Sequence, residues 1–301
     1  MSKVFISHGD IILDNIYNGD LNLIKQDGGG SNWNTLYNLS YLGETCYAVG
    51  TCGKDKEGDI ALSSLKSGNV NTDLVRRDDI STSIMNIIIP NQTNLGDNSI
   101  IHSWYSPITN KRTLFFRDNL PIQLPEDILQ NDIYVLLDKF ETINFDFISN
   151  LKSKKVCLDI GHIRFIEHFA KQYLTMFFKT ANLIQLNETV KPLLFERLQI
   201  QNEFDFFNLF DLDLLVVTKG KKGATFVFKE DNQLKTIDKE PEVIAKVVDS
   251  SGAGDAFFAS VIQGYAYTDT INSDFINKIF STANKASRTV ISQVGSRRKN
   301  K

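Results

Sequence analysis

Residues 247–267, which read VVDSSGAGDAFFASVIQGYAY, hold the pattern that decides the fold. Two β-branched residues lead to an aspartate and two serines, and the run Gly252-Ala253-Gly254 then comes directly before a second aspartate, Asp255. The apolar residues at 243–248 predict a strand, and the helix-compatible residues at 256–267 predict a helix. Glycines between two such segments mark a tight turn. The stretch therefore predicts a strand–turn–helix unit, which is typical of α/β folds.

The glycine-rich turn can be interpreted in two ways. The first turn of a helix presents unpaired N–H groups, and glycine lets the backbone approach a ligand closely, so the turn predicts a phosphate or oxyanion site. Asp255 would then take a proton from a hydroxyl that attacks the phosphate. In the simpler alternative, Asp255 only complements the helix dipole, which contributes ~0.3–1 kcal/mol. Phe257 stands where the dinucleotide fingerprint GxGxxG requires glycine, and no Walker P-loop is present.

Outside this stretch, apolar segments of strand length alternate with helical segments, which predicts a mostly parallel sheet with helices on both faces. Predicted strands lie at 4–7, 46–49, 133–137, 155–159, 183–186 and 214–218, and predicted helices lie at 34–42 and 54–66. Short β-rich pieces at 84–89, 99–104 and 112–116 interrupt this alternation and predict an inserted antiparallel sheet. We therefore expect one domain over residues 1–301, with a small lid built from approximately 11–24 and 84–117.

Composition describes an ordinary globular protein without a strong charge bias. The chain has 301 residues, 42% of them hydrophobic and 23% charged, and a formal net charge of −3. This balance gives no reason to expect a nucleic-acid or membrane partner, and no apolar run reaches the ~18 residues of a membrane span. Cys46, Cys52 and Cys157 form no CxxC pair, which favours buried thiols in the cytoplasm. The basic residues 297–301 are interpreted as a solvated chain end.

Several segments together resemble one enzyme family. DSSGAGDAF is similar to the signature D-T-x-G-A-G-D-x-F of the ribokinase/PfkB carbohydrate kinases. Six further segments resemble the family in the same order: GDIILDNI, GGGSNWNTLYNLSYLG, VGTCGKDKEG, LNETV, VVTKGKKGA and TANKASRTVISQVGS. The resemblance implies a ribokinase-like three-layer α/β/α fold with a small β-sheet lid. It also implies ATP-dependent transfer of the γ-phosphoryl group to a hydroxymethyl group of a small sugar.

The resemblance assigns roles to individual residues. Asp255 would be the general base, and Gly252, Ala253 and Gly254 would form the anion hole. Substrate hydroxyls would be bound by Asp14, Gly29, Gly30 and Asn34. ATP would be bound by Asn187, Thr218, Gly220, Gly223 and Asn284. Asn187 and Glu188 would help to hold Mg²⁺, and Asp249 would lie beside a monovalent-cation site for K⁺.

The chain departs from the family pattern at Val190, at Lys219 and at Ser250-Ser251, where a pair with threonine is usual, and Ser31 bears on the choice of substrate. Val190 replaces the acid that ends the N-x-x-E motif, which puts the usual Mg²⁺ arrangement in doubt, and a glutamate there is expected to tighten Mg²⁺ binding or leave it unchanged. Lys219 replaces an apolar residue, and solvent exposure is favoured over contact with a phosphate. Ser31 stands where kinases of phosphorylated sugars often carry lysine, which favours a neutral sugar.

Other interpretations stay open. A nucleoside is the alternative acceptor, and Val190 supports a catalytically impaired relative that only binds sugar or nucleotide. Trp104-Tyr105 could cover a substrate ring, form the apolar face of the lid, or make a homodimer contact. The four histidines show no metal spacing and are expected to be structural: His8, His102, His162 and His168.

Overall fold

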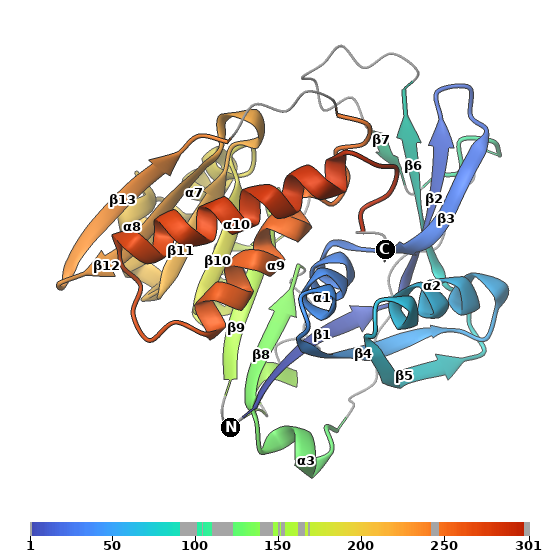
Figure 1. Ribbon diagram of the computed structural model, residues 1–301, viewed down its shortest axis with the longest axis horizontal. Coiled ribbons are helices and arrows are strands. Elements are labelled where there is room, and N and C mark those ends of the chain that lie inside the picture. The colour runs from blue at the N-terminus through green and yellow to red at the C-terminus, as the bar shows by residue number, and fades with distance from the viewer. Residues whose placement is uncertain are drawn as a thin grey trace.

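The computed structural model describes residues 2–90, 101–103, 105–109, 123–138, 147–149, 151, 154–161, 166–167, 169–241 and 247–297 (Figure 1). The predicted strand at 112–116, Trp104, His162 and His168 lie outside these residues. Among the described helices, none combines the length and the apolar character that crossing a bilayer requires.

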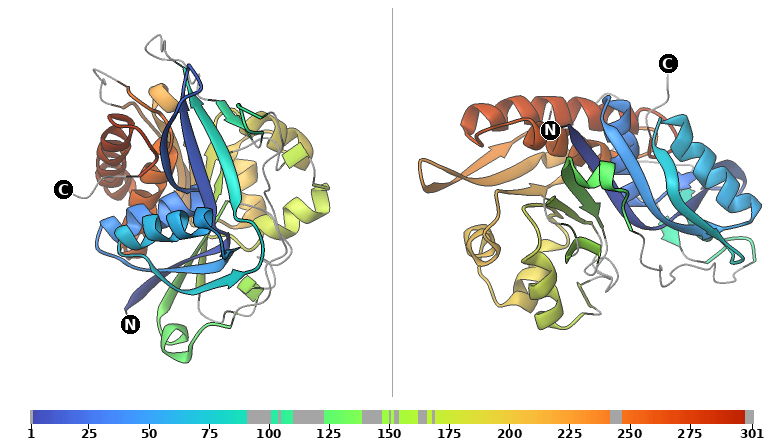
Figure 2. Two further views of the ribbon diagram at one scale, coloured as in Figure 1. Left: turned by 90° about the vertical axis from the view of Figure 1, so that its right-hand side faces the viewer. Right: turned by 90° about the horizontal axis from the view of Figure 1, so that it is seen from below.

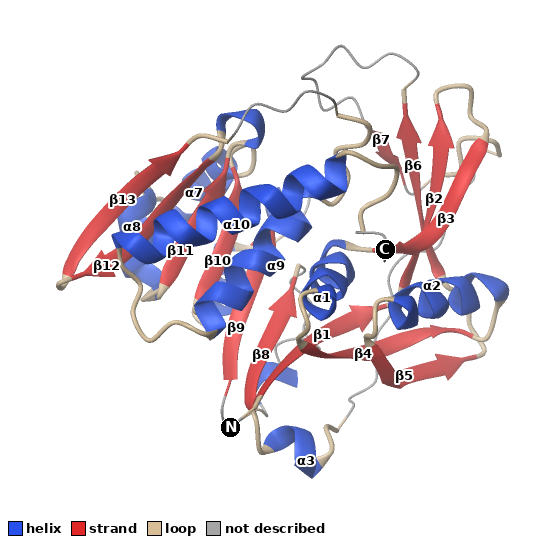
Figure 3. Cartoon of the chain, in the orientation of Figure 1, coloured by secondary structure: helices blue, strands red, loops and turns tan. Residues whose placement is uncertain are grey.

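A large sheet of nine described strands forms the middle layer (Figure 3). Seven of these strands run parallel to one another, and β12 and β13 extend the sheet at one edge through antiparallel pairs. The mostly parallel sheet that the alternation predicted is thus confirmed. In spatial order the strands are β13 (Gln233–Lys239), β12 (Ala224–Glu230), β11 (Leu214–Thr218), β10 (Leu183–Asn187), β9 (Lys154–Ile160), β8 (Asp132–Leu137), β1 (Lys3–Asp10), β4 (Thr45–Gly53) and β5 (Asn71–Asp78).

Helices cover both faces of the large sheet, and side chains alternate between the two cores. Phe5 and Leu136 lie in the core covered by α1, α2, α9 and α10, whereas Ile6 and Val135 lie in the core covered by α6, α7 and α8. Figure 2 shows helices on the two opposite faces of the sheet. This confirms the three-layer arrangement. The helices are α1 (Ser31–Tyr41), α2 (Lys56–Ser67), α3 (Glu126–Leu129), α6 (Lys171–Phe178), α7 (Lys191–Leu198), α8 (Glu203–Phe210), α9 (Ala253–Ala266) and α10 (Ser273–Ile291), with a 3₁₀ turn at Gly220–Lys222.

A second, smaller sheet stands beside the large one. It has the strand order β3 (Leu23–Gly29), β2 (Ile12–Asn18), β6 (Ser83–Ile89) and β7 (Ile101–Ser103) (Figure 1). The inserted strands β6 and β7 pair antiparallel, as predicted, whereas β2 and β6 pair in parallel. These two strands are far apart in the sequence, so no hairpin turn dictates their direction. The strand β3 also runs beyond residue 24 and ends at Gly29.

The strand–turn–helix unit differs from its prediction at both ends. Val247 and Val248 lie outside any strand, and residues 242–246 are not described. The helix α9 begins at Ala253, three residues earlier than expected, because Gly252 adopts φ +73° and acts as its N-cap residue. A left-handed conformation costs glycine little, so the helix can start inside the glycine run. Asp255 consequently lies in the first turn of α9.

Candidate active site

Asp255 is the centre of a buried polar cluster. Its side chain is 8% exposed and accepts two hydrogen bonds, one from Ser31 Oγ at 2.5 Å and one from Asn34 Nδ2 at 2.9 Å. Both donors come from α1, which packs directly against α9. The first turn of α1 and the first turn of α9 therefore face each other and together orient the Asp255 carboxylate.

The two glycines in the turn before Asp255 have different surroundings. A Cβ on Gly252 would lie 2.4 Å from the backbone oxygen of Ser296, so no other residue fits there without a shift. In contrast, a Cβ on Gly254 would come no nearer than 3.8 Å to its closest neighbour. No described side chain caps α9. The N–H of Ala253 donates to the backbone oxygen of Ser250 at 3.3 Å, whereas the N–H groups of Gly254 and Asp255 have no hydrogen bond among the described residues and could face an anion.

The four expected substrate-binding residues lie in the same region as Asp255. Asn34 contacts it directly, and Asp14 lies in β2 with 5% of its surface exposed. A Cβ on Gly29 would lie 1.8 Å from Asp14 Oδ1, so glycine is required for the carboxylate to occupy this place. Gly30 has φ +89° and precedes α1, where it turns the chain from β3 into the helix. The sequence had likened Asp14 to the family's first strand, whereas it lies in the second one here.

Burial changes the acidity of this cluster. It raises the pKa of Asp255 to about 6, although the hydrogen bonds from Ser31 and Asn34 act in the opposite direction. Burial likewise raises the pKa of Asp14 to about 7 and that of Asp159 to about 7. Desolvation disfavours the charged form of a carboxyl group, so all three groups bind protons more tightly than in water.

Sequence reasoning missed Asp159, which lies near the end of β9 and close to Asp255. Ser31 Oγ, which contacts Asp255, also lies 3.1 Å from Asp159 Oδ2. Gln185 Nε2 donates a hydrogen bond to Asp159 Oδ1 at 3.2 Å. Ser31 has one hydroxyl proton and two carboxylates to serve. A pKa of about 7 lets Asp159 carry the second proton near neutral pH. The only signal in the sequence was an acid at the carboxyl end of a predicted strand.

Arg297 was interpreted wrongly from the sequence as part of a solvated chain end. It is 4% exposed, and its Nε donates to Asn34 Oδ1 at 3.0 Å. The chain returns to the site because Gly295, with φ +99°, donates its N–H to Asp249 Oδ2 at 2.8 Å. Residues 298–301 lie outside the described part of the chain.

The expected nucleotide-binding residues lie at the ends of adjacent strands. Asn187 and Thr218 are paired in register between β10 and β11. Gly220 and Gly223 follow β11 and both have positive φ angles, of +55° and +94°. Asn284 is buried in α10. The first four residues therefore belong to one edge of the sheet, where ligands of open α/β sheets bind.

Lys219 is only partly exposed, which differs from the free solvent exposure that was favoured. Its Nζ forms an ion pair with Asp238 Oδ1 at 2.6 Å, and 26% of its side chain is exposed. The neighbouring strand β13 supplies this partner, because Thr225 of β12 pairs with Asp238 in the antiparallel edge. A lysine at this position thus holds the sheet edge rather than extending freely into solvent.

Asn187 and Glu188, which were expected to help hold Mg²⁺, each make another contact in the structure. Asn187 Oδ1 accepts two hydrogen bonds from Thr189, and Glu188 pairs with Lys222 at 3.5 Å. Val190 is fully buried in the hydrophobic core. Across the described residues, no group of three Asp, Glu, His or Cys side chains could hold a metal ion. We therefore derive no catalytic step through a metal bound by this motif.

Asp249, the residue expected beside a monovalent cation, is buried and accepts hydrogen bonds from two backbone N–H groups. It is 1% exposed, and its two oxygens accept the N–H groups of Ser251 and Gly295 at 2.8 Å each. Asp249 thereby ties the turn before α9 to the segment after α10. Each oxygen retains a second lone pair, so a K⁺ site at Asp249 stays a prediction.

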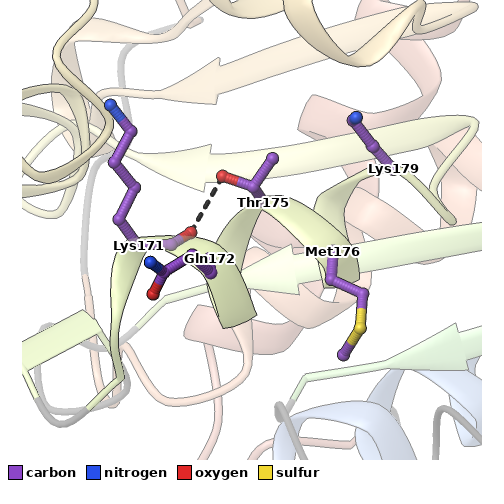
Figure 4. A pocket seen from close by; sticks show the side chains of 5 residues that line it. All are labelled: Lys171, Gln172, Thr175, Met176 and Lys179. Carbon is purple, nitrogen blue, oxygen red and sulfur yellow. Dashed lines mark hydrogen bonds between the residues drawn. The ribbon is translucent and has the colours of Figure 1, made fainter.

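The remaining expectations concern residues away from Asp255. All three cysteines are buried and unpaired, as expected. His8 stacks on Phe147 with ring centroids 4.6 Å apart, which suits a structural histidine. A surface hollow lies along and just beyond α6, on the opposite face of the sheet (Figure 4). Its lining residues belong to one short segment and include no acid: Lys171, Gln172, Thr175, Met176 and Lys179.

Comparisons with known proteins agree with this arrangement. A model of the pfkB family carbohydrate kinases matches residues 20–301. Ribokinase of Dictyostelium discoideum is 25% identical over 285 residues, covering 89% of this chain and 85% of its own length. ATP-dependent 6-phosphofructokinase of Thermoanaerobacterium thermosaccharolyticum is 24% identical over 291 residues, covering 89% of this chain and 84% of its own length. The protein is a kinase, and thus a phosphotransferase. It belongs to the pfkB family of carbohydrate kinases.

Solved structures of ribokinase fold superpose on nearly the whole chain. An uncharacterized sugar kinase of Pyrococcus horikoshii in complex with ATP has a TM-score of 0.73 and 19% identity, covering 97% of this chain and 93% of its own. Fructokinase of Vibrio cholerae, solved with fructose, ADP and calcium, has a TM-score of 0.70 and 18% identity, covering 98% and 94%. A nucleoside kinase of Methanocaldococcus jannaschii has a TM-score of 0.71 and 19% identity, covering 98% and 93%.

The raised pKa of Asp14 should make the stability of the folded protein depend on pH. Its pKa is about 7 in the folded protein against an ordinary 3.8, so the folded state gains stability from protonated Asp14 at low pH and loses it as the pH rises through about 7. The variant Asp14→Asn should therefore gain stability over the wild type between about pH 5 and about pH 8, on the order of 1 kcal/mol or more. Thermal melts across this range measure the difference. The matched control is Asp20→Asn, which changes an exposed aspartate. The prediction is contradicted if the stability difference from the wild type is equally independent of pH in both variants.

Proposed function

We propose that the protein transfers the γ-phosphoryl group of ATP to a hydroxymethyl group of a small neutral sugar, with Asp255 as the general base. One observation carries the proposal: a buried aspartate with a pKa of about 6 lies in the first turn of a helix that begins within Gly252-Ala253-Gly254. A general base works best when its pKa lies near the working pH. The helix amides beside it attract the phosphate. Deprotonation of the acceptor and stabilisation of the transferred phosphoryl group would therefore take place at one site.

The proposed step forms one bond to the γ-phosphorus and breaks another. The acceptor hydroxyl donates a hydrogen bond to the Asp255 carboxylate and attacks the γ-phosphorus, and its proton passes to Asp255. The bond from the γ-phosphorus to the bridging oxygen breaks, and ADP leaves. The amides of the run 252–254 stabilise the charge of the transferred group. Asp14, Asn34 and the glycines of β3 would hold the other hydroxyls of the sugar, and the small sheet would close over them as a lid.

The charges around Asp255 favour a neutral acceptor. Ser31 presents a neutral hydroxyl to Asp255 and Asp159. A phosphorylated sugar would need a cation at this position to pair with its phosphate. Asp14 adds a third buried acid, and these acids, when ionised, would repel the phosphate of such a sugar. A fructokinase among the structural neighbours binds fructose, which supports the choice of a sugar. The nucleotide would be bound at the ends of β10 and β11, and a structural neighbour solved in complex with ATP supports the choice of ATP.

Two cofactor expectations are part of the proposal. Mg²⁺ neutralises the phosphates of ATP in phosphoryl transfer, and it commonly keeps several waters and binds substrate phosphates with few protein ligands. Mg²⁺ dependence is therefore expected even though the motif at 187–190 provides no cage. K⁺ dependence would follow if Asp249 served the cation site that the family resemblance implies.

An acceptor panel tests the proposed function. ADP release would be measured with ATP and neutral ketoses, aldoses, fructose 6-phosphate and nucleosides, and ³¹P NMR would locate the phosphate in the product. We expect turnover with at least one neutral sugar, and a slow release of ADP without acceptor. Turnover with fructose 6-phosphate alone, or with nucleosides alone, would overturn the neutral-sugar assignment. Tight ATP binding without any turnover would instead indicate the catalytically impaired relative.

A further inference from the structure

The segment after α10 carries Arg297 into the cluster around Asp255. Asp249 holds this segment through the N–H of Gly295, and Gln293 Nε2 donates to the backbone oxygen of Arg297 at 2.7 Å. Ser296 lies against Gly252, where a Cβ would clash with it. The chain end is thus packed on the start of α9, so Arg297 has a defined place rather than a mobile one.

The guanidinium of Arg297 is engaged on several sides. Its Nε donates to Asn34 Oδ1 at 3.0 Å, and its Nη1 donates to Ser64 Oγ at 2.5 Å. Asp27 Oδ1 lies 4.0 Å from Nη1, and the ring of Tyr37 lies 5.1 Å from the guanidinium carbon. Nη2 is buried without a hydrogen-bond partner among the described residues. These contacts hold the plane of the guanidinium in one orientation.

The contact with Asn34 determines which way its amide points. Arginine can only donate hydrogen bonds, so Asn34 must present its oxygen to Arg297. The amide nitrogen then faces Asp255, to which it donates at 2.9 Å. The opposite orientation would place two donors against each other at Arg297 and two acceptors against each other at Asp255. Arg297 therefore selects the orientation in which Asn34 supports the base.

Arg297 also balances the charge of the cluster. Among the described residues it is the one buried Lys or Arg side chain. Although burial alone would raise the pKa of Asp27, Arg297 together with Lys25 and Ser64 holds it below its usual value. The charge of Arg297 also opposes the burial that raises the pKa values of Asp14 and Asp255. The titratable and charged groups that face this cluster are Asp14, Lys25, Asp27, Tyr37, Asp138, Asp159, Asp249, Asp255 and Arg297.

We propose that Arg297 is a positioning residue of the phosphoryl-transfer site, which orients Asn34 toward Asp255 and supplies the buried positive charge that keeps the base able to accept a proton. This inference rests on the proposed function, because it assigns Arg297 an action through Asp255. The distance in sequence between Arg297 and Asn34 is 263 residues, so the contact joins the chain end to the acceptor site.

The pH dependence of kcat/KM tests the proposal with the best acceptor of the panel. Without Arg297, the neighbouring acids disfavour the ionised base, so the acid limb of Arg297→Gln should move up by ~1 pH unit or more. Loss of the Asn34 orientation should lower kcat by roughly tenfold or more at neutral pH. The matched control Arg197→Gln removes an exposed arginine of α7, and its profile should equal the wild-type profile.

A second variant covers the case in which Arg297→Gln does not fold. Arg297→Lys retains a buried positive charge and a donor, so its acid limb should stay close to the wild-type position while kcat falls because the guanidinium contacts are lost. An acid limb that is unchanged in Arg297→Gln, or that moves equally in both variants, would overturn the proposal. A large rise of KM for an anionic acceptor with an unchanged pH profile would also overturn it, since Arg297 would then bind substrate.

A double-mutant cycle separates this proposal from the assignment of Asp255. If Arg297 acts through Asp255, then Arg297→Gln should change kcat little in the Asp255→Asn background. Independent, multiplying losses would overturn the positioning role while leaving Asp255 as the base. Near-normal turnover of Asp255→Asn alone would instead refute the base assignment, and with it the proposed route of action of Arg297.

Discussion

Asp255→Asn is expected to lower kcat by ~10²–10⁴, the range for a positioned general base, while the KM for ATP changes little. Asparagine keeps the shape of the side chain and can still accept from Ser31 or Asn34, which now contact the carboxylate at 2.5 Å and 2.9 Å. What it cannot do is accept the proton of the attacking hydroxyl. Steady-state kinetics on the purified variant, with the acceptor saturating, measure the loss.

The fold of this variant should be preserved at neutral pH. Burial raises the pKa of Asp255 to about 6, so the ionised group is costly in the folded state and a neutral amide removes that cost. A role confined to the helix dipole predicts the reverse, namely a stability loss of ~0.3–1 kcal/mol with near-normal turnover. The matched control is Asp274→Asn, which removes an exposed acid from the first turn of α10. A folded Asp255→Asn enzyme with more than about a tenth of wild-type kcat would contradict the base assignment.

Val190→Glu is expected to destabilise the protein by several kcal/mol, because a carboxylate would be placed among apolar side chains. The sequence pattern suggested that a glutamate at this position would serve Mg²⁺. The structure changes that expectation, since Val190 has no exposed surface and packs in the core at the N-terminal end of α7. Thermal melts should show a large fall in Tm, which is partly reversed at low pH where the carboxyl group is protonated.

The neighbouring position provides the control for this variant. Thr189 is exposed, so Thr189→Glu adds the same charge one residue earlier without burial and should leave Tm nearly unchanged. An unchanged Tm for Val190→Glu, together with tighter Mg²⁺ binding, would show that the side chain reaches the metal after all. Equal destabilisation by both variants would indicate a general effect of charge at the start of α7, and would contradict the burial argument.

Local patterns in the sequence determined the architecture of the large sheet. Strand β11 has the predicted bounds 214–218, and the alternation of apolar runs with helical segments predicted a mostly parallel sheet. Such runs are informative because strands buried on both faces must be apolar throughout, and the period of the pattern reports burial directly. The resemblance of several segments to one family also indicated Asp14, Asn34 and Asp255, which the structure brings to one place.

The tertiary structure alone decided the surroundings of these residues. A serine at the start of a helix gives no sign that its hydroxyl will bridge two buried acids, as Ser31 does with Asp159 and Asp255. A cluster of basic residues at a chain end is usually solvated, yet Arg297 is buried against Asn34 from 263 residues away. The direction of β6 beside β2 was likewise beyond local patterns. Periodicity and propensity report the neighbourhood of each residue along the chain, whereas contacts between distant residues and the resulting pKa values exist only once the whole chain has packed.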